Sequence, residues 1–249
     1  MNNMVIVVTG GAQGIGRKIA QHFLAAKWKS VIWEIDNKAG VELAKDLNHP
    51  DFLNVECNVA IEDEVKAAVR LTLERFGRID VLINNAAIMS NKPISALSLA
   101  DWQKVIDVNL TGPFLCTKYC ETELRRNNGS IINICSTRAF QSEVNTEAYS
   151  ASKGGVFALT HALAVSLGPE VRVNSISPGW IDQLEEQKSS STKKKFFSEE
   201  DHKQHPAGRI GKTDDIARLV WFLSQPENSF ITAQNFVIDG GMTRKMIYL

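Results

Sequence analysis

The segment "MVIVVTGGAQGIG", residues 4–16, joins a short apolar run to a glycine-rich turn, and a helical pattern follows it. Glycines occupy positions 10, 11, 14 and 16 in the spacing GxxxGxG. A strand, a glycine-rich turn and a helix in this order let the backbone approach a pyrophosphate and aim the helix N-terminus at it. Alone, the turn is a weak signal, because many such turns are only tight turns. Its place between the first strand and the first helix favours a dinucleotide site.

Beyond this segment, short apolar runs alternate with longer helical patterns along the chain. Several of the runs are apolar on both faces, as strands covered by helices on both sides must be. The alternation predicts an α/β fold with a mostly parallel, doubly wound, seven-stranded sheet. The predicted strands are residues 4–8, 30–35, 52–57, 80–84, 130–135, 171–177 and 235–239. Because no repeat or domain boundary is visible, residues 1–249 are predicted to form a single dinucleotide-binding and catalytic domain.

An acidic residue follows the second predicted strand. Asp36 lies twenty positions after Gly16, where a carboxylate can accept hydrogen bonds from the adenosine ribose hydroxyls. Its charge would repel the 2′-phosphate of NADP. Gln13 is neutral, and Arg17 and Lys38 are the nearest positive charges in the sequence. These residues favour NAD over NADP, although a turn aspartate after a strand is a common alternative.

The composition narrows the classes of partner. The chain has 28 basic and 28 acidic residues, and this balance argues against nucleic acid or a membrane as the main partner. The N-terminal apolar run is too short for a signal peptide, and no stretch of apolar residues is long enough to span a membrane. The four cysteines form no CxxC pair, which favours buried, reduced thiols over a metal site. We therefore predict a cytoplasmic protein without a bound metal.

The segment "EAYSASKGG", residues 147–155, holds a tyrosine and a lysine four positions apart. A helix here would place Tyr149 and Lys153 on one face. A nearby ammonium favours the phenolate and lowers a tyrosine pKa, ordinarily about 10, by about 1–3 units. That shift would suit a general acid or base. An isolated YxxxK is more often a surface aromatic beside a surface lysine. The residues around it in the fold therefore decide between a catalytic pair and a surface pair.

Several further motifs occur in a characteristic order and spacing. They are "TGGAQGIG", "NNAA" (84–87), "VNL" (108–110), "INICS" (132–136), "YSASK" (149–153) and "SPG" (177–179). Together they resemble the short-chain dehydrogenase/reductase family, in its compact single-domain branch with TGxxxGxG and YxxxK motifs. The resemblance extends over essentially the whole chain. It implies a Rossmann-like fold and an NAD(P)-dependent enzyme that acts on CH–OH groups of a small alcohol or carbonyl substrate.

The resemblance also implies a catalytic tetrad of Asn109, Ser136, Tyr149 and Lys153. Tyr149 would exchange a proton with the substrate oxygen, and Ser136 would polarise that oxygen. Lys153 would lower the tyrosine pKa and hold the nicotinamide ribose. Asn109 would anchor a water that links the lysine to solvent, although its alternative role is to satisfy buried backbone groups.

The residues predicted to contact the cofactor come from the glycine turn and from the resemblance. They are Gly10, Gln13, Gly14, Ile15, Gly16, Asp36, Asn58, Val59, Asn85, Ala86, Tyr149, Lys153, Pro178, Gly179 and Ile181. Two positions depart from the family pattern. Asn58 replaces an aspartate that usually contacts the adenine, and Gln183 replaces a threonine that usually meets the carboxamide.

The substrate pocket is predicted above the C-terminal ends of the strands. A charged, serine-rich segment within residues 183–205 is interpreted as a mobile flap over it. Arg138 and Glu143 would lie in the wall, where they pair with each other or with a neighbouring subunit, or serve a polar or anionic substrate. The predicted walls are residues 88–93, 137–146 and 180–205.

The favoured function is therefore an NAD-dependent oxidoreductase that interconverts a secondary alcohol and a ketone. One alternative is an NADP-dependent 3-oxoacyl-carrier reductase, which would need a basic cofactor clamp. Another is a catalytically silent, NAD-binding regulatory protein. By resemblance, residues 101–123 and 149–167 would form the surface of a homodimer or homotetramer.

Overall fold

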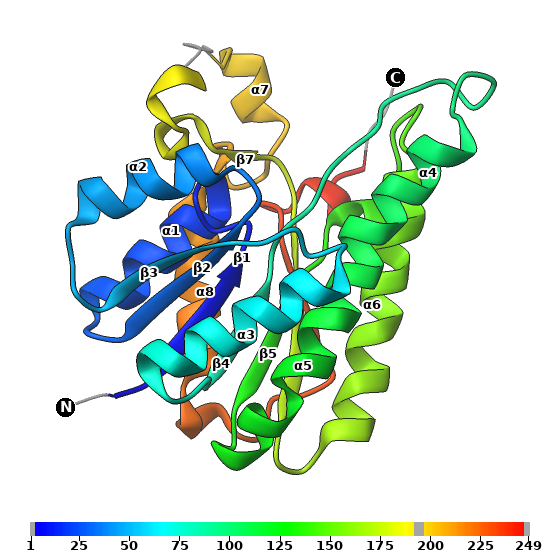
Figure 1. The fold of residues 1–249 in the computed structure, drawn as a ribbon. Helices are drawn as coiled ribbons and strands as arrows, with labels where there is room; N and C mark the ends of the chain where they lie inside the picture. Colours follow the sequence, from blue (N-terminus) through cyan, green and yellow to red (C-terminus); the bar gives the residue numbers. More distant parts are fainter. Residues whose placement is uncertain (1–2, 192–196, 247–249) are drawn as a thin grey trace.

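A seven-stranded parallel sheet runs through the centre of the computed structural model, which describes residues 3–191 and 197–246 (Figure 1). The strand order is β3-β2-β1-β4-β5-β6-β9. The strands are β1 (Val5–Thr9), β2 (Lys29–Glu34), β3 (Phe52–Glu56), β4 (Val81–Asn84), β5 (Ser130–Ile134), β6 (Arg172–Pro178) and β9 (Asn235–Ile238). All seven predicted strands are thus confirmed, each within one residue at either end. A short parallel pair, β7 (Ile181–Asp182) with β8 (Gly211–Lys212), was not predicted.

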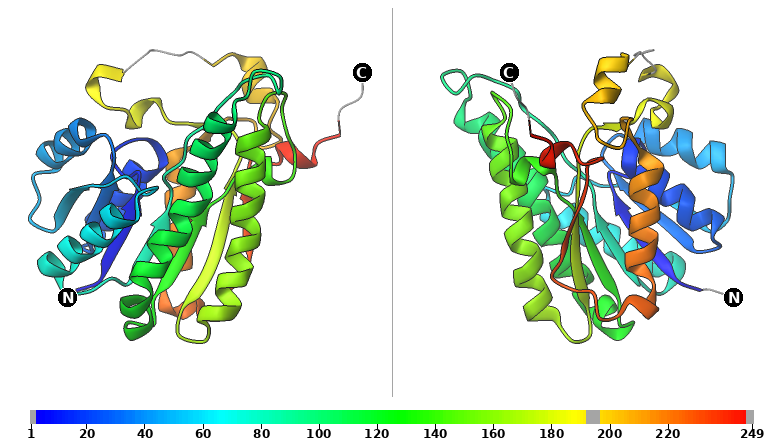
Figure 2. Two further views of the ribbon diagram at one scale, coloured as in Figure 1. Left: turned by 45° about the vertical axis from the view of Figure 1, so that its right-hand side comes forward. Right: turned by 180° about the vertical axis from the view of Figure 1, so that it is seen from behind.

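Helices cover both faces of the sheet (Figure 2). The helices are α1 (Gly14–Ala25), α2 (Asn37–Leu47), α3 (Glu62–Phe76), α4 (Leu99–Ile106), α5 (Gly112–Arg126), α6 (Glu147–Leu167), α7 (Glu199–Lys203) and α8 (Thr213–Ser224). Residues of α1, α2 and α8 share one apolar cluster with the sheet, and residues of α3, α5 and α6 share a second cluster. Within the described part of the chain, no helix is long and apolar enough to cross a membrane.

Strand β1 shows why the predicted runs are apolar on both faces. Ile6 and Val8 belong to the cluster with α1 and α8, whereas Val5 and Val7 belong to the cluster with α3 and α5. All four side chains are fully buried. Because burying such a side chain contributes about 1.5–3 kcal/mol, both faces of this central strand hold the two helix layers against the sheet.

The order of strands reverses at β1, because β2 and β3 are added on one side of it and β4, β5 and β6 on the other. At such a switch point the loops that follow the two central strands leave in opposite directions, and a crevice opens at their carboxyl ends. The loops after β1 and β4 contain the glycine turn and the "NNAA" motif, so both lie beside this crevice.

A chain of buried hydrogen bonds links two strands to α6. Asn84 Nδ2 donates to Asn133 Oδ1 at 2.8 Å, and Asn133 Nδ2 donates to Thr160 Oγ1 at 2.9 Å. Thr160 Oγ1 in turn donates to the carbonyl of Val156 at 2.8 Å. The side chain of Asn84 therefore joins β4 to β5. Because buried polar groups are costly without partners, this chain fixes α6 against the sheet.

Candidate active site

The glycine turn between β1 and α1 is too closely packed to accept side chains at its glycines. Gly14 has a φ of +58°, a left-handed conformation that strains residues with a Cβ. At Gly16, a Cβ would lie 2.3 Å from the carbonyl oxygen of Gly10. Any side chain at Gly16 would therefore force the backbone apart. The bare backbone and the N-terminus of α1 form a cradle suited to a pyrophosphate.

Hydrogen bonds from the "NNAA" segment hold this turn in place. Asn85 Nδ2 donates to the carbonyls of Thr9 and Gly10 at 3.0 and 2.9 Å. Thr9 Oγ1 accepts from the backbone N–H groups of Asn85 and Ala86, each at 3.0 Å. Asn85 and Ala86 both line the cavity, but the amide nitrogen of Asn85 is committed to the turn, so it positions the cradle.

Asp36 belongs to the start of α2 rather than to the end of β2. Strand β2 ends at Glu34, one residue earlier than predicted, and Asp36 caps α2 by accepting from the N–H of Ala39 at 3.2 Å. Lys188 Nζ contacts the other carboxylate oxygen, and this contact is the main reason that the pKa of Asp36 is lowered. The positive charge in contact with Asp36 is therefore that of Lys188, which is far away in sequence, rather than that of Arg17 or Lys38, its neighbours in the sequence.

Glu34 is a residue of this region that sequence reasoning missed. Its side chain is buried, and its carboxylate accepts from the N–H of Ala12 at 3.0 Å and from the N–H of Asp36 at 3.0 Å. It therefore ties the glycine turn to the segment that carries Asp36. A single charged residue at the end of an otherwise apolar strand was the available signal.

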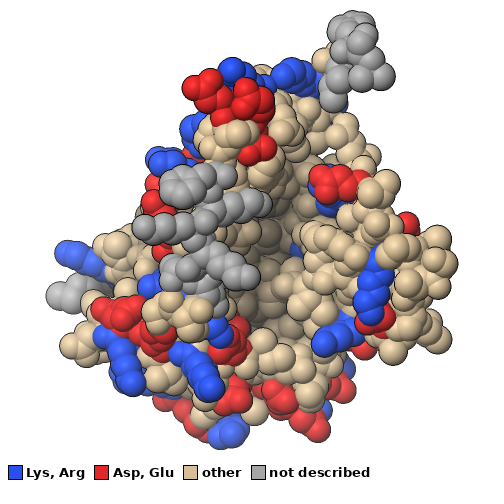
Figure 3. Space-filling model, turned by 90° about the horizontal axis from the view of Figure 1, so that it is seen from above, with Lys and Arg blue, Asp and Glu red and all other residues tan. Residues whose placement is uncertain are grey.

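Two cavities lie along the crevice on the cofactor side. The first, of about 410 Å³, extends from the glycine turn to Tyr149 and Lys153. The second, of about 560 Å³, is lined by Asn58 and Val59. Seen from above, the surface is hollowed between the two sides of the molecule (Figure 3). Of the predicted cofactor residues, only Gly16 and Asp36 line neither cavity.

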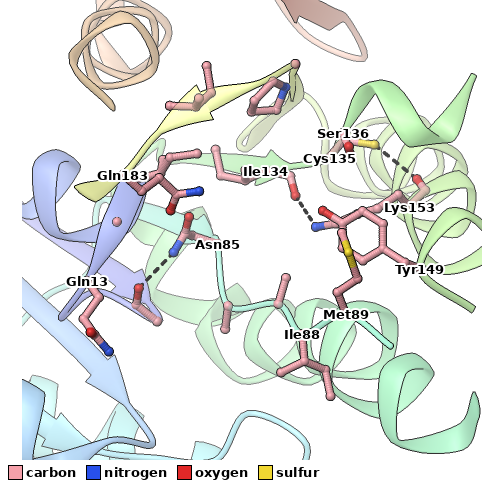
Figure 4. Close-up of a pocket in the computed structure, with 18 of the residues that line it drawn as sticks. Gln13, Asn85, Ile88, Met89, Ile134, Cys135, Ser136, Tyr149, Lys153 and Gln183 are labelled. Carbon is pink, nitrogen blue, oxygen red and sulfur yellow. Dashed lines mark hydrogen bonds between the residues drawn. The ribbon is translucent and has the colours of Figure 1, made fainter. Parts of the chain in front are cut away.

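The tyrosine and lysine of α6 meet Ser136 at one end of the first cavity (Figure 4). Lys153 is 2% exposed, and its Nζ donates to the carbonyl of Ile134 at 2.8 Å. The same Nζ lies 5.5 Å from the centre of the Tyr149 ring. Ser136 is hydrogen-bonded to the phenol, and Ser136 Oγ also accepts from the N–H of Arg138 at 3.1 Å. Three residues of the predicted tetrad are thus brought together.

The titration of this pair differs from the sequence prediction. Burial raises the pKa of Tyr149, while the hydrogen bond with Ser136 and the charge of Arg138 act to lower it. Burial also lowers the pKa of Lys153 to about 8. The predicted lowering of the tyrosine pKa by Lys153 is therefore wrong for this structure, because desolvation outweighs the neighbouring charges.

Asn109 lies apart from these three residues, in a π-helical turn between α4 and α5. Its Oδ1 accepts from the N–H of Ile88 at 2.8 Å. Its Nδ2 donates to the carbonyl of Ile88 at 2.9 Å and to Ser152 Oγ at 3.0 Å. The side chain therefore satisfies buried backbone groups, which was the alternative role, and its part in catalysis stays a prediction.

A third cavity, of about 490 Å³, adjoins the first and shares Ser136, Tyr149 and Gln183 with it. Arg138 and Glu143 line this cavity and form an ion pair with each other, which was one of the expected alternatives. All three predicted walls contribute to it. Gln183 lies where the two cavities join, so its side chain is within reach of both.

The predicted flap, residues 183–205, is described except for residues 192–196. Its first part is tied to the cofactor side of the molecule. Glu186 is buried and lies 3.0 Å from Lys18 Nζ on α1, and Lys188 reaches the start of α2. The rings of Phe197 and His205 pack against that of Trp180, which lines the substrate cavity, and these contacts hold the later part of the flap near it. Movement of the flap stays a prediction.

The histidines and cysteines of the described chain are not gathered into a metal site. His202 Nδ1 accepts from the N–H of Ile210 at 3.2 Å, and the ring of His205 packs 6.1 Å from that of Trp180. Cys116 and Cys120 are free and buried. Within residues 3–191 and 197–246, no group of three or more His, Cys, Asp or Glu side chains is arranged to hold a metal ion.

Known proteins are similar to this chain in fold and sequence over nearly their full length. Residues 10–243 match the family described as "Enoyl-(Acyl carrier protein) reductase". An uncharacterised oxidoreductase of Thermotoga maritima is 54% identical over 100% of this chain and 99% of its own. The apo structure of a SCOR enzyme from Clostridium thermocellum has a TM-score of 0.90 at 43% identity, covering 100% of this chain and 96% of that one.

A third likeness concerns the ligand. The structure of a 3-ketoacyl-(acyl-carrier-protein) reductase from Brucella melitensis complexed with NADH has a TM-score of 0.87 at 29% identity, covering 96% of this chain and 98% of the other. The parallel sheet, the glycine turn and the clustered serine, tyrosine and lysine agree with these matches. The chain therefore belongs to the short-chain dehydrogenase/reductase family of oxidoreductases.

Proposed function

We propose that this protein is an NAD-dependent oxidoreductase that interconverts a secondary alcohol and a ketone. The observation that supports this most is one cavity lined by the glycine turn at one end and by Ser136, Tyr149 and Lys153 at the other. A dinucleotide and a proton-transfer group would therefore meet in the same space. When bound there, a nicotinamide dinucleotide supplies or accepts the hydride.

The described residues fit such a dinucleotide. The backbone at Gly10 and Gly14 lines the first cavity, where a pyrophosphate would lie, and Asp36 provides acceptors for ribose hydroxyls. Asn58 and Val59 line the second cavity, which would take the adenine. Pro178, Gly179 and Ile181 line the first cavity and would lie along the nicotinamide half.

The roles of the remaining residues follow from their contacts. Tyr149 would exchange a proton with the substrate oxygen, and Ser136 would donate a hydrogen bond to that oxygen. Lys153 is fixed by the carbonyl of Ile134, and its ammonium would hold the nicotinamide ribose. Asn109 would keep the segment at Ile88 in place. Burial of the site excludes water, which strengthens each of these interactions.

Purified protein tests this proposal directly. We expect it to reduce NAD⁺ in the presence of one or more sugars, polyols, hydroxy acids or hydroxysteroids, or to oxidise NADH with the matching ketones. Tight NADH binding with no turnover on any of these compounds would instead support the regulatory alternative.

The choice between NAD and NADP depends on Asp36 and Lys188. The carboxylate favours ribose hydroxyls and repels a 2′-phosphate, but Lys188 offers that phosphate a counter-charge. This contact is the observation that favours the NADP-dependent 3-oxoacyl-carrier reductase as second candidate. We propose that Asp36 dominates, because its other oxygen is already fixed by the cap of α2.

Replacing each partner should separate these effects. We expect Asp36→Ala to weaken NADH binding about 10- to 100-fold, the range of hydrogen bonds to a charged group, and to improve NADPH binding. Lys188→Ala should leave NADH binding within about threefold, since hydrogen bonds to Asp36 do not need the lysine. Fluorescence titration with both nucleotides measures these constants. Tighter binding of NADPH than NADH by the wild-type protein would overturn the assignment to NAD.

We also propose a homodimer or homotetramer that associates through α5 and α6. An apolar groove of about 540 Å³ lies between these helices and includes Leu110, Phe114 and Leu159. Phe114 is 46% exposed, which is unfavourable for a large aromatic in water. Light scattering should give a multiple of 27.6 kDa, and Phe114→Glu should reduce it. A monomeric mass for the wild-type protein would contradict this proposal.

We further propose that the protein works in the cytoplasm. All four cysteines are free and buried, a state typical of proteins from reducing compartments.

A further inference from the structure

The third cavity contains one half-buried cation that the proton-transfer chemistry does not use. Arg138 has a side chain only 20% exposed, and it lines this cavity together with Ser136 and Tyr149. Among the described residues that line it, Arg138 is the single cation and Glu143 the single anion. The two form an ion pair, so the cavity holds a charge pair beside the reacting groups.

The two members of this pair differ in how firmly they are held. The side chain of Arg138 is 20% exposed and that of Glu143 is 69% exposed. The backbone of Arg138 is held in a 3-10 turn, where its main-chain N–H donates to Ser136 Oγ, whereas Glu143 lies in a segment outside any helix or strand. The guanidinium is therefore the less exposed partner on the more firmly held backbone, and the carboxylate is the one that water can replace.

Arg138 is also close enough to influence the phenol. Burial has the largest effect on the pKa of Tyr149, and the positive charge of Arg138 is among the effects that oppose it. A group bound to the guanidinium would thus lie near the oxygen that exchanges the proton. The cavity, at about 490 Å³, has room for a small molecule rather than a macromolecule.

We propose that Arg138 binds a carboxylate of the substrate, so that the enzyme acts on small hydroxy acids and the corresponding oxo acids. The substrate carboxylate replaces that of Glu143 on the guanidinium, and Glu143 moves into solvent. One ion pair is exchanged for another, so no charge is left buried without a partner. A guanidinium suits this role because it binds a carboxylate through two parallel hydrogen bonds. The inference rests on the proposed function.

The experiment compares acids with their neutral amides. Lactate, 3-hydroxybutanoate and 4-hydroxypentanoate would each be assayed with NAD⁺ beside the corresponding amide, because the series varies the distance between carboxylate and carbinol. We expect the wild-type enzyme to prefer at least one acid by about 10- to 100-fold in kcat/KM. Arg138→Gln should abolish that preference, mainly by raising KM for the acid.

Two further variants separate recognition from structural support. Glu143→Gln breaks the same ion pair but removes the carboxylate that competes with the substrate for Arg138, so it should lower KM for the acid. If the ion pair only supported the structure, KM would instead rise in both Arg138→Gln and Glu143→Gln. Arg209→Gln is the matched control, because Arg209 pairs with Asp215 at 2.7 Å and lines none of the cavities described above. It should leave the acid preference unchanged.

A binding measurement keeps the inference testable without turnover. Butanoate should bind the complex with NADH more tightly than butanamide, and this difference should vanish in Arg138→Gln. Activity on alcohols without any preference for acids would overturn the inference and leave the proposed function intact. Higher activity on neutral polyols that falls in Glu143→Gln would also overturn it. If no compound is turned over, the proposed function fails, and butanoate binding no tighter than butanamide would then overturn this inference as well.

Discussion

Replacing Tyr149 by phenylalanine is expected to lower kcat/KM about 1,000-fold while leaving NADH binding within about threefold. The variant keeps the ring that packs beside Lys153 and loses only the hydroxyl that is hydrogen-bonded to Ser136. General acid–base catalysis contributes about 10²- to 10⁴-fold, and loss of the phenol hydroxyl should remove this contribution. The measurement is steady-state turnover on the best substrate, together with titration by NADH.

Tyr119→Phe provides the matched control. This variant also loses a hydrogen-bonded hydroxyl, since the phenol of Tyr119 donates to Glu62 on the outer face of the molecule. It lines none of the three cavities, so turnover should change by less than about twofold. A Tyr149→Phe enzyme that keeps more than a tenth of wild-type turnover would rule out the proposed proton transfer.

Replacing Lys153 by methionine is expected to remove activity and to stabilise the protein. The lysine pKa falls from 10.5 to about 8 because the ammonium is buried, and that difference corresponds to about 3 kcal/mol of unfavourable free energy at pH 7. Methionine removes this cost but gives up the hydrogen bond to Ile134, which is worth about 1 kcal/mol. The net gain should be about 2 kcal/mol in the free energy of unfolding.

The gain should depend on pH in a defined direction. Below about pH 8 the native protein keeps a buried, charged lysine, so the cost is present in full. Between about 8 and 10.5 the unfolded chain binds more protons than the native one, so wild-type stability rises with pH relative to the variant. The difference between the two proteins should therefore shrink over this range.

Urea unfolding at pH 7 and pH 10 measures this difference. Activity should fall at least about 100-fold in the same variant, because the ammonium that would hold the ribose is absent. Lys153→Arg should keep the charge, and with it the instability. Equal stabilities of wild type and Lys153→Met at pH 7 would show that the buried ammonium carries no such cost.

The sequence predicted the sheet well because its signal is local. A central strand such as β1 is an apolar run, and burial on both faces requires such a run whatever surrounds it. The clustering of Ser136, Tyr149 and Lys153 was predicted through the order of the motifs. The seven strands and this cluster could thus be predicted from the sequence alone.

Features that depend on tertiary contacts could not be predicted from local sequence patterns. Lys188 lies 152 positions from Asp36, and no local pattern indicates that they meet. The pKa of Tyr149 is set by how deeply the fold buries it, whereas the YxxxK spacing gives only the neighbouring charge. Asn109 was assigned to a water, but its bonds to Ile88 depend on where the loop after β4 returns.

The buried chain from Asn84 through Asn133 to Thr160 has a consequence for the aim of the phenol. Thr160 lies eleven positions after Tyr149 on α6, about 16 Å along the helix axis. Apolar packing is non-directional, so it would tolerate small changes in the rotation of this helix. A slip of one residue would turn Tyr149 by about 100° and break the bond from Asn133. The buried amide hydrogen bonds thus fix the rotation of α6 about its own axis. The orientation of the reacting hydroxyl is therefore set by contacts in the interior of the molecule.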